Sequence, residues 1–336
     1  MGIKIEKEGN VRIDLLGGTL DLWPINVAIP KAVTLNMAID LKAQVSLEEM
    51  DGDDILIESK DYQKTYRFQK GQDLNDWLDD FPEMSFIVQL LRGLDRVDGL
   101  KLVLESGSPP GAGLGGSSAM GMALVFALDE FLQLGWPGEK MVRYVQNIEA
   151  KILHAGPAGY QDYYPALHGG ILALRQGPCA IEVEQLFHSD SKHYLEDWTT
   201  LVYSGLARRS GINNWEVYKG FFDGKKSIVD GLGKIADLSD RAYESFLAKD
   251  FPTFLSLMAK EGEHRMELFP SIVPTNVKKL VDSLENLMGF KMCGAGGGGC
   301  FLLIHPPVMK GKVIKQVEKF QMKVLDYHIV PPFSHR

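Results

Sequence analysis

The sequence predicts an α+β protein with two domains. Its 336 residues exceed the length at which a single hydrophobic core usually stops growing. Short β-branched or alternating segments fill residues 11–70, whereas consecutive helical segments fill residues 213–288. A β-rich beginning without long helices, and a later part in which helices and strands occur together, indicate an α+β arrangement. We place the two domains at residues 1–185 and 186–336.

The first domain is expected to begin with a series of strands. An apolar stripe at helical spacing within residues 73–96 then predicts a buried helix, and the alternating segment 100–104 predicts a further strand. The strands before that helix are expected over residues 11–16, 33–39, 43–47, 55–58 and 65–68.

A glycine-rich loop follows, where residues 109–119 read PPGAGLGGSSA. Its glycines lack Cβ atoms, so the backbone can turn sharply and its N–H groups can approach a ligand closely. The apolar run over residues 118–128 predicts a helix. The start of that helix leaves unpaired N–H groups and the positive end of the helix dipole at Ser117 and Ser118. The loop is therefore predicted to bind phosphate.

Considered without any resemblance, the residues of this loop allow three other interpretations. Its G-x-G-x-x-G spacing would fit a dinucleotide-binding fold, but that fold needs a strand after the helix, and residues 135–138 (GWPG) lead into another helix instead. A Walker loop needs lysine where Ser117 stands. The glycines could also serve tight turns alone, although a serine pair at the helix start favours anion binding.

Three carboxylates stand out around the loop. Glu149 falls on the apolar stripe of a helix expected over residues 138–154, and a carboxylate there is costly unless it is paired or binds a metal. A salt bridge to Lys151 or Arg143 is the structural alternative. Asp21 follows a glycine turn and Asp162 opens a new apolar segment, so either could simply cap a turn or helix.

The second half of the chain predicts a separate α+β unit. A strand at residues 171–174 still belongs to the first domain; beyond the boundary a strand is expected over residues 199–203, followed by a basic turn that contains Arg208 and Arg209. A second glycine loop lies between two strands around residues 291–304. The remaining elements are helices at roughly 213–235, 238–249, 251–267, 274–288 and 308–323, and a last strand at 324–329.

Three motifs, in this order, resemble those of the GHMP kinases (galactokinase, homoserine kinase, mevalonate kinase and phosphomevalonate kinase). They are VRIDLLGGTLD at 11–21, PPGAGLGGSSA at 109–119 and KMCGAGGGG at 291–299. Within the family, AGYQD at 158–162 followed by HGG at 168–170 is most similar to the D-glycero-D-manno-heptose 7-phosphate kinase and fucose kinase branch. Residues 19–20 depart from that branch, because Thr-Leu stands where it usually shows Gly-Thr.

This resemblance implies both a fold and an activity. The N-terminal domain is expected to resemble domain 2 of ribosomal protein S5, and the C-terminal domain a ferredoxin-like α+β unit. The implied activity is transfer of the γ-phosphate of ATP, with magnesium, to a hydroxyl of a sugar or sugar phosphate. Two alternatives stay open: a kinase for another small acceptor such as fucose, galactose or mevalonate, and a catalytically silent nucleotide- or sugar-binding protein. The sequence does not indicate an oligomeric state.

The resemblance also assigns roles to individual residues. Asp162 is implied as the catalytic carboxylate beside Arg12, which favours its ionised form, so orienting the acceptor hydroxyl with late proton acceptance is expected. Asp21 is implied to bind substrate hydroxyls, and Ser118 and Glu149 to bind magnesium. Arg208 and Arg209 could hold a substrate phosphate, and His264 is a further candidate. Nucleotide binding is assigned to Pro110, Gly111, Ala112, Gly113, Leu114, Gly115, Gly116, Ser117, Ser118, Gly296 and Gly297.

The composition restricts the partners and the location. With 45% hydrophobic and 24% charged residues, the chain matches ordinary globular proteins. Its net charge of −8 argues against nucleic-acid binding, which depends on clustered Lys and Arg. No apolar run reaches the roughly 18 residues needed to cross a bilayer, so a cytoplasmic protein without membrane partners is expected. Cys179, Cys293 and Cys300 lack metal spacing and are expected to be reduced.

Overall fold

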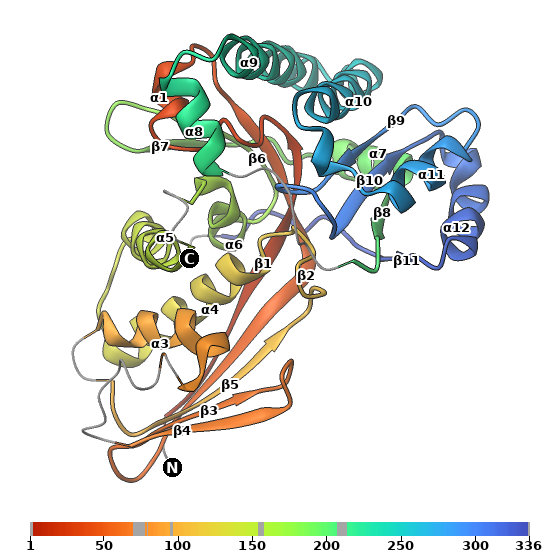
Figure 1. The fold of residues 1–336 in the computed structure, drawn as a ribbon. Helices are drawn as coiled ribbons and strands as arrows, with labels where there is room; N and C mark the ends of the chain where they lie inside the picture. The colour runs from red at the N-terminus through yellow and green to blue at the C-terminus, as the bar shows by residue number, and fades with distance from the viewer. Residues whose placement is uncertain are drawn as a thin grey trace.

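The computed structural model describes residues 3–69, 78, 80–94, 97–153, 158–206 and 214–334. Two sheets organise these residues, a long twisted one in the first half of the chain and a small one in the second (Figure 1). The expected α+β architecture is confirmed.

The first sheet has seven strands in the order β4-β3-β5-β2-β6-β7, with β1 paired to β2. Its pairs are antiparallel except for β3 and β5. The long β2 pairs with three other strands, so it forms the backbone of the sheet. The strands are β1 (Lys4–Leu16), β2 (Thr34–Glu49), β3 (Ile55–Ser59), β4 (Lys64–Phe68), β5 (Leu100–Ser106), β6 (Ile171–Gln176) and β7 (Ile181–Gln185).

Helix α4 (Gly116–Leu132) packs on β1 and β2 and against α5 (Gly138–Leu153). It is buried continuously from Ser118 to Leu128, as expected for a helix that is apolar on every side. The other short helices of this half are α1 (Ile25–Ala28), η1 (Pro82–Met84), α3 (Ser85–Arg92), η2 (Tyr160–Asp162) and α6 (Tyr164–His168).

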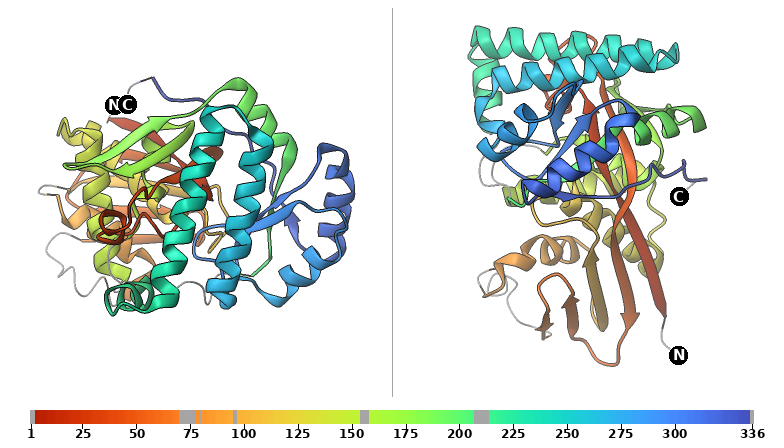
Figure 2. Two further views of the ribbon diagram at one scale, coloured as in Figure 1. Left: turned by 90° about the horizontal axis from the view of Figure 1, so that it is seen from above. Right: turned by 90° about the vertical axis from the view of Figure 1, so that its right-hand side faces the viewer.

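The second sheet has the antiparallel order β11-β8-β10-β9, which is the ferredoxin-like arrangement with helices between strands. Helices α9 and α10 lie side by side above it (Figures 1 and 2). The strands are β8 (Thr199–Tyr203), β9 (Gly289–Met292), β10 (Cys300–Ile304) and β11 (Lys323–Val324). The helices are α7 (Ser189–Trp198), α8 (Asn214–Phe222), α9 (Lys226–Leu247), α10 (Phe251–Leu268), η3 (Pro270–Ile272), α11 (Thr275–Asp282), η4 (Pro307–Met309) and α12 (Lys310–Lys319).

Two expectations about the strands are wrong. The strands expected at 33–39 and 43–47 are one strand, β2, because β1 pairs along nearly the whole length of β2 and two register shifts in this pairing absorb the irregularity. The last segment does not form one strand over 324–329. After β11 the chain crosses to the first sheet, where Ile329 pairs with Ile39.

The expected helix break at residues 236–237 is also wrong. Helix α9 is continuous over these residues, and the break between helices lies instead around Gly224, after α8 has ended at Phe222. Gly224 adopts φ +69°, a left-handed conformation that glycine adopts without steric cost. Gly231 and Gly233 are instead accommodated inside α9.

The two halves share part of their hydrophobic core. One apolar cluster combines residues of the first sheet and α4 with Leu238 of α9 and Phe254 of α10. The two parts of the chain therefore do not have fully separate cores, and the domain boundary at residue 185 remains a prediction. None of the described helices has the length and apolar character needed to cross a bilayer.

Candidate functional site

The glycine loop turns directly into the N-terminus of α4, two residues earlier than expected. Gly111, Gly113 and Gly115 adopt φ values of +66°, +74° and +73°, which only glycine adopts readily. Gly115 is the N-cap residue, and no side chain caps the helix. The N–H groups of the first turn, including those of Ser117 and Ser118, are therefore available to an anion.

The second glycine loop packs directly on the first. The backbone N–H of Cys300 donates to the carbonyl oxygen of Ala112 at 2.7 Å. A Cβ atom at Gly294 would lie 2.8 Å from the oxygen of Gly113, and one at Gly299 would lie 2.6 Å from the oxygen of Gly111. These approaches are too close for any side chain, so the glycines are required for the two loops to touch.

The two glycines predicted to bind nucleotide in the second loop lie elsewhere. A Cβ atom at Gly296 would lie 2.6 Å from Cβ of Ile272, and the N–H of Gly297 donates to the carbonyl oxygen of Ile272 at 2.7 Å. In the described structure, the glycines of the second loop that lie against the first loop are Gly294 and Gly299. A nucleotide contact by Gly296 or Gly297 remains a prediction.

Arg12 and Asp162 form an ion pair between β1 and the end of η2. The Nε and Nη2 atoms of Arg12 donate to Oδ1 of Asp162 at 2.9 and 2.6 Å. The remaining Nη1 donates to the carbonyl oxygen of Gly113 at 2.6 Å. The Arg12 side chain is only 4% exposed, whereas that of Asp162 is 29% exposed. The arginine thus joins the glycine loop to a carboxylate that solvent, or a substrate, can reach.

The cap interpretation of Asp162 is wrong, since its carboxylate turns to Arg12 and no side chain caps α6. A Cβ atom at Gly115 would lie 3.3 Å from Cγ and 3.6 Å from Oδ2 of Asp162. Oδ1 is therefore held by Arg12, while Oδ2 faces the N-cap of α4. The carboxylate stands where the phosphate end of a ligand is expected.

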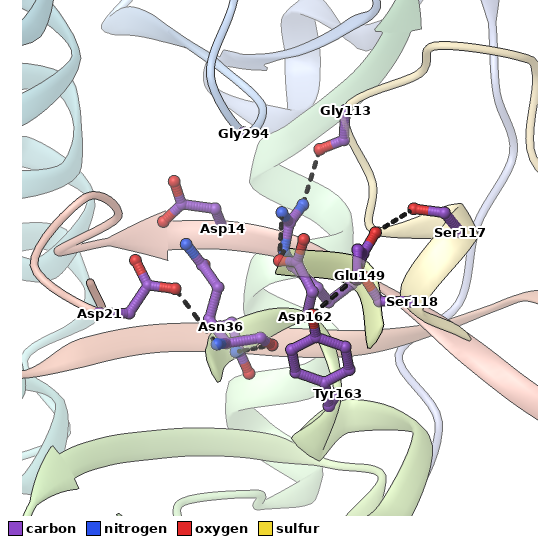
Figure 3. Close-up of polar contacts among 12 residues, drawn as sticks. Asp14, Asp21, Asn36, Gly113, Ser117, Ser118, Glu149, Asp162, Tyr163 and Gly294 are labelled. Carbon is purple, nitrogen blue, oxygen red and sulfur yellow. Dashed lines mark hydrogen bonds and ion pairs between the residues drawn. The ribbon is translucent and has the colours of Figure 1, made fainter. Parts of the chain in front are cut away.

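Glu149 lies at the same helix start, with its carboxylate turned toward Ser117 and Ser118 (Figure 3). Its carboxylate accepts hydrogen bonds from Ser117 and Ser118, each at 2.7 Å, and from the Tyr163 hydroxyl at 2.6 Å. The salt bridge considered for Glu149 is not formed within the described residues. Burial raises the pKa of the Glu149 carboxyl, and the three hydroxyl donors only partly oppose that effect.

This group of oxygens suits a magnesium ion. Magnesium prefers hard oxygen ligands and typically takes one or two from the protein, which the carboxylate of Glu149 and the hydroxyl of Ser118 could supply. A buried carboxylate held only by hydroxyls also favours a cation beside it. The residues predicted as metal ligands therefore fit the ion chemically.

Asp21 is the third carboxylate of the site and is 3% exposed. Its Oδ2 accepts from the backbone N–H of Gln161 at 3.2 Å, so it contacts the segment that carries Asp162 rather than capping its own turn. Burial, and then repulsion by Asp162, raise the pKa of Asp21 to about 7. Figure 3 shows Asp21 and Glu149 on opposite sides of Asp162.

Two side-chain amides, those of Asn36 and Gln161, lie near Asp21. Asn36 donates from Nδ2 to the carbonyl oxygen of Gln161 at 3.1 Å. The Oδ1 atom of Asn36 and the Oε1 atom of Gln161 are buried and have no hydrogen-bond partner among the described residues. Buried polar atoms without partners are uncommon and call for an explanation, and hydroxyl groups of a ligand would satisfy both.

The sequence did not reveal several of these residues. Tyr163 and Gln161 adjoin Asp162, but nothing in their spacing indicated that one would contact Glu149 and the other Asp21. Arg208 and Arg209 lie outside the described residues. His264 lies away from the site, where its ring contacts the carbonyl oxygen of Gly231 at 3.0 Å.

Two family models match the chain in the expected order. The model of the GHMP kinases N terminal domain matches residues 84–170, and the model of the GHMP kinases C terminal region matches residues 242–321. The first match contains the glycine loop, Glu149 and Asp162.

Individual relatives are distant but extensive. The D-glycero-alpha-D-manno-heptose 7-phosphate kinase of Campylobacter jejuni is 24% identical over 96% of each chain. The L-fucokinase/L-fucose-1-P guanylyltransferase of Bacteroides fragilis is 24% identical over 88% of this chain, but this chain spans only 34% of its length.

A solved D-glycero-D-manno-heptose 1-phosphate kinase from Bacteriodes thetaiotaomicron has the same fold. Its TM-score is 0.74 at 19% identity, with 99% of this chain and 98% of that chain covered. The matching family models, the shared fold and the joined glycine loops lead to one conclusion: the chain belongs to the GHMP kinase family.

Proposed function

We propose that this protein is an ATP- and magnesium-dependent kinase that phosphorylates a hydroxyl group of a sugar or sugar phosphate. The observation that carries the proposal is the placement of Asp162, whose Oδ1 is held by Arg12 while Oδ2 faces the N-cap of α4. A carboxylate at the anion-binding end of a helix is poorly suited to binding the anion itself. It is well suited to an alcohol that approaches a bound phosphate.

The chain's own residues divide the work of phosphoryl transfer. This reaction asks a protein mainly for positioning and charge stabilisation. The N–H groups at the start of α4 would hold the β- and γ-phosphates of ATP, and Arg12 would fix the orientation of Asp162. Oδ2 of Asp162 would then accept a hydrogen bond from the acceptor hydroxyl and take up its proton late in the transfer.

Ser118 and Glu149 would hold the magnesium ion. When bound, the ion supplies positive charge that offsets the charge developing on the phosphates. Tyr163 would keep the Glu149 carboxylate in place through its 2.6 Å hydrogen bond. Because Tyr163 follows Asp162 directly, one short turn would orient both the metal ligand and the catalytic carboxylate.

The surroundings of Asp21 favour a hydroxyl-rich acceptor. Asp21 can accept two or more hydroxyl hydrogens, and the unpartnered oxygens of Asn36 and Gln161 add acceptors beside it. A substrate carboxylate there would instead meet Asp21 and Asp162, while Arg12 is already bonded to Asp162 and Gly113. A sugar is therefore favoured over mevalonate.

A single panel assay tests the proposal. ADP release would be measured with ATP and with heptose, heptose 7-phosphate, fucose, galactose or mevalonate, each with and without magnesium. Magnesium-dependent release with at least one sugar, well above the rate without acceptor, is expected. Nucleotide binding without turnover on every acceptor would favour the silent binding protein. Faster turnover of mevalonate than of any sugar would overturn the acceptor class.

A further inference from the structure

A cluster of four buried charged residues lies behind the site and takes no part in the mechanism above. The side chains of Asp14 and Glu261 are each 0% exposed, that of Lys291 is 1% exposed and that of Arg265 is 3% exposed. Arg265 contacts Asp14 at 3.0 Å. Lys291 contacts Asp14 at 3.6 Å and forms a close hydrogen bond with Glu261. The cluster ties β1 to α10 and β9 across the two halves of the chain.

Burying four charges is expensive. Each ion loses several kcal/mol of hydration, which the attraction inside a protein only just offsets. The two acids and two bases balance in charge, yet Oδ1 of Asp14, Oε1 of Glu261 and Nε of Arg265 have no hydrogen-bond partner among the described residues. Stabilisation of the fold is thus a weak explanation for this cluster, because apolar side chains at these positions would stabilise the fold equally well.

Arg265 makes one further contact that Lys291 and Glu261 do not show. Its Nη2 donates to the carbonyl oxygen of Gly294 at 2.9 Å, while Nη1 remains on Asp14. Asp14 lies in a rigid strand two residues beyond Arg12. The planar fork of one arginine therefore connects the second glycine loop to the strand that carries Arg12.

That contact continues to the catalytic pair. Gly294 touches Gly113, since a Cβ atom at Gly294 would lie 2.8 Å from the Gly113 oxygen. The same oxygen accepts the 2.6 Å hydrogen bond from Nη1 of Arg12, whose other nitrogens hold Asp162. A shift of Gly294 would thus displace Gly113 and, through Arg12, the carboxylate of Asp162.

We propose that Arg265 is a positioning residue, which holds the second glycine loop against the first by bridging Asp14 and Gly294 and so fixes the geometry of Arg12 and Asp162. The inference rests on the proposed kinase activity. Arg265 does not touch the reacting groups and acts only through the loops.

Lysine at position 265 separates this role from simple charge balance. It keeps the positive charge beside Asp14, but a single ammonium group cannot reproduce the arginine fork. For Arg265→Lys we expect an unfolding midpoint within a few degrees of the parent, together with a fall in kcat of roughly 10- to 100-fold, the scale of small misplacements in an active site. The KM values for nucleotide and acceptor should change much less.

The double variant Glu261→Gln/Lys291→Met is the matched control. It removes the other acid and base of the cluster, neither of which contacts a loop carbonyl among the described hydrogen bonds. We expect a lower unfolding midpoint and a kcat within about threefold of the parent, a change of less than ~0.7 kcal/mol. A parental kcat in Arg265→Lys would overturn the proposal, as would an equal loss of kcat in both variants.

Amide hydrogen exchange provides a readout that does not need turnover. Exchange in residues 111–118 and 293–299 should accelerate in Arg265→Lys and stay unchanged in the control. Unchanged loop exchange in Arg265→Lys would refute the positioning role even if the parent is active. If the parent protein turned over no acceptor, the proposed function would be refuted. The exchange experiment would still test whether Arg265 holds the two glycine loops together.

Discussion

Replacing Asp162 with asparagine tests the proposed chemistry most sharply. Asparagine keeps the shape of the side chain and leaves one oxygen for Arg12, but it removes the negative charge and puts an amide where Oδ1 or Oδ2 stands. Oδ1 now accepts two hydrogen bonds, at 2.9 and 2.6 Å, so the amide nitrogen would be driven toward the Oδ2 position that faces the N-cap of α4. There it would donate a hydrogen bond and could no longer accept a proton.

The effects of Asp162→Asn on the reaction rate and on the stability of the fold can be worked out separately. Loss of proton acceptance typically costs 10²- to 10⁴-fold in rate, or roughly 3–5 kcal/mol of barrier. Arg12 would remain buried, 4% exposed, with a weakened partner. Hydrogen bonds to charged groups contribute ~1.5–3 kcal/mol, and Asp162 is 29% exposed, so about 1–2 kcal/mol of stability should be lost. The rate effect is the larger one.

The assay compares kcat, nucleotide affinity and the unfolding midpoint of Asp162→Asn with those of the parent. The matched control is Asp223→Asn, because Asp223 pairs with Lys219 at the surface far along the chain from the site. We expect kcat to fall at least a hundredfold, nucleotide affinity to change little, and the control to match the parent. A folded Asp162→Asn variant with the parental kcat would refute the assigned role.

Three further changes probe the remaining parts of the site. Glu149→Gln should raise the magnesium concentration needed for half-maximal activity. Loss of a residue that only supports a metal ligand typically costs roughly 10- to 100-fold in metal affinity, and loss of a direct ligand should cost more. An unchanged magnesium titration would exclude Glu149 as a ligand. Since the pKa of Asp21 is raised to about 7, its ionised form appears only as pH rises through 7, so kcat/KM for the acceptor should rise between pH 6 and 8. Asp21→Asn should flatten that profile, and a persistent inflection would assign it to another group. Gly294 has φ +59°, and a Cβ atom there would lie 2.8 Å from the Gly113 oxygen, so Gly294→Ala should lower the free energy of unfolding by at least ~1–2 kcal/mol and weaken nucleotide binding. Gly233→Ala is the control, because a Cβ atom at Gly233 meets open space, and it should have neither effect. Equal behaviour of the two variants would contradict the required loop contact.

Local chemistry made much of the site predictable from sequence. The glycines at 111–116 and the serines after them have few uses other than a sharp turn into an exposed helix start, and α4 begins there. Asp162 and Arg12 lie 150 positions apart, yet the motif resemblance placed them together. The expected pairing is present at 2.6 Å.

Residues that act through long-range packing could not be predicted. Asp14, Arg265 and Lys291 carry ordinary charges in the sequence, and only the meeting of β1, α10 and β9 buries them together. The continuity of β2 likewise depends on pairing with β1 rather than on its own residues. The crossing of the last segment to Ile39 has no local signal at all.

Locating a bound nucleotide tests the central claim most directly. A crystal structure with magnesium and a non-hydrolysable ATP analogue should place the β- and γ-phosphates against the backbone N–H groups of Ser117 and Ser118, with Oδ2 of Asp162 facing the terminal phosphate. Phosphates bound elsewhere, with the start of α4 left in contact with solvent alone, would contradict the account.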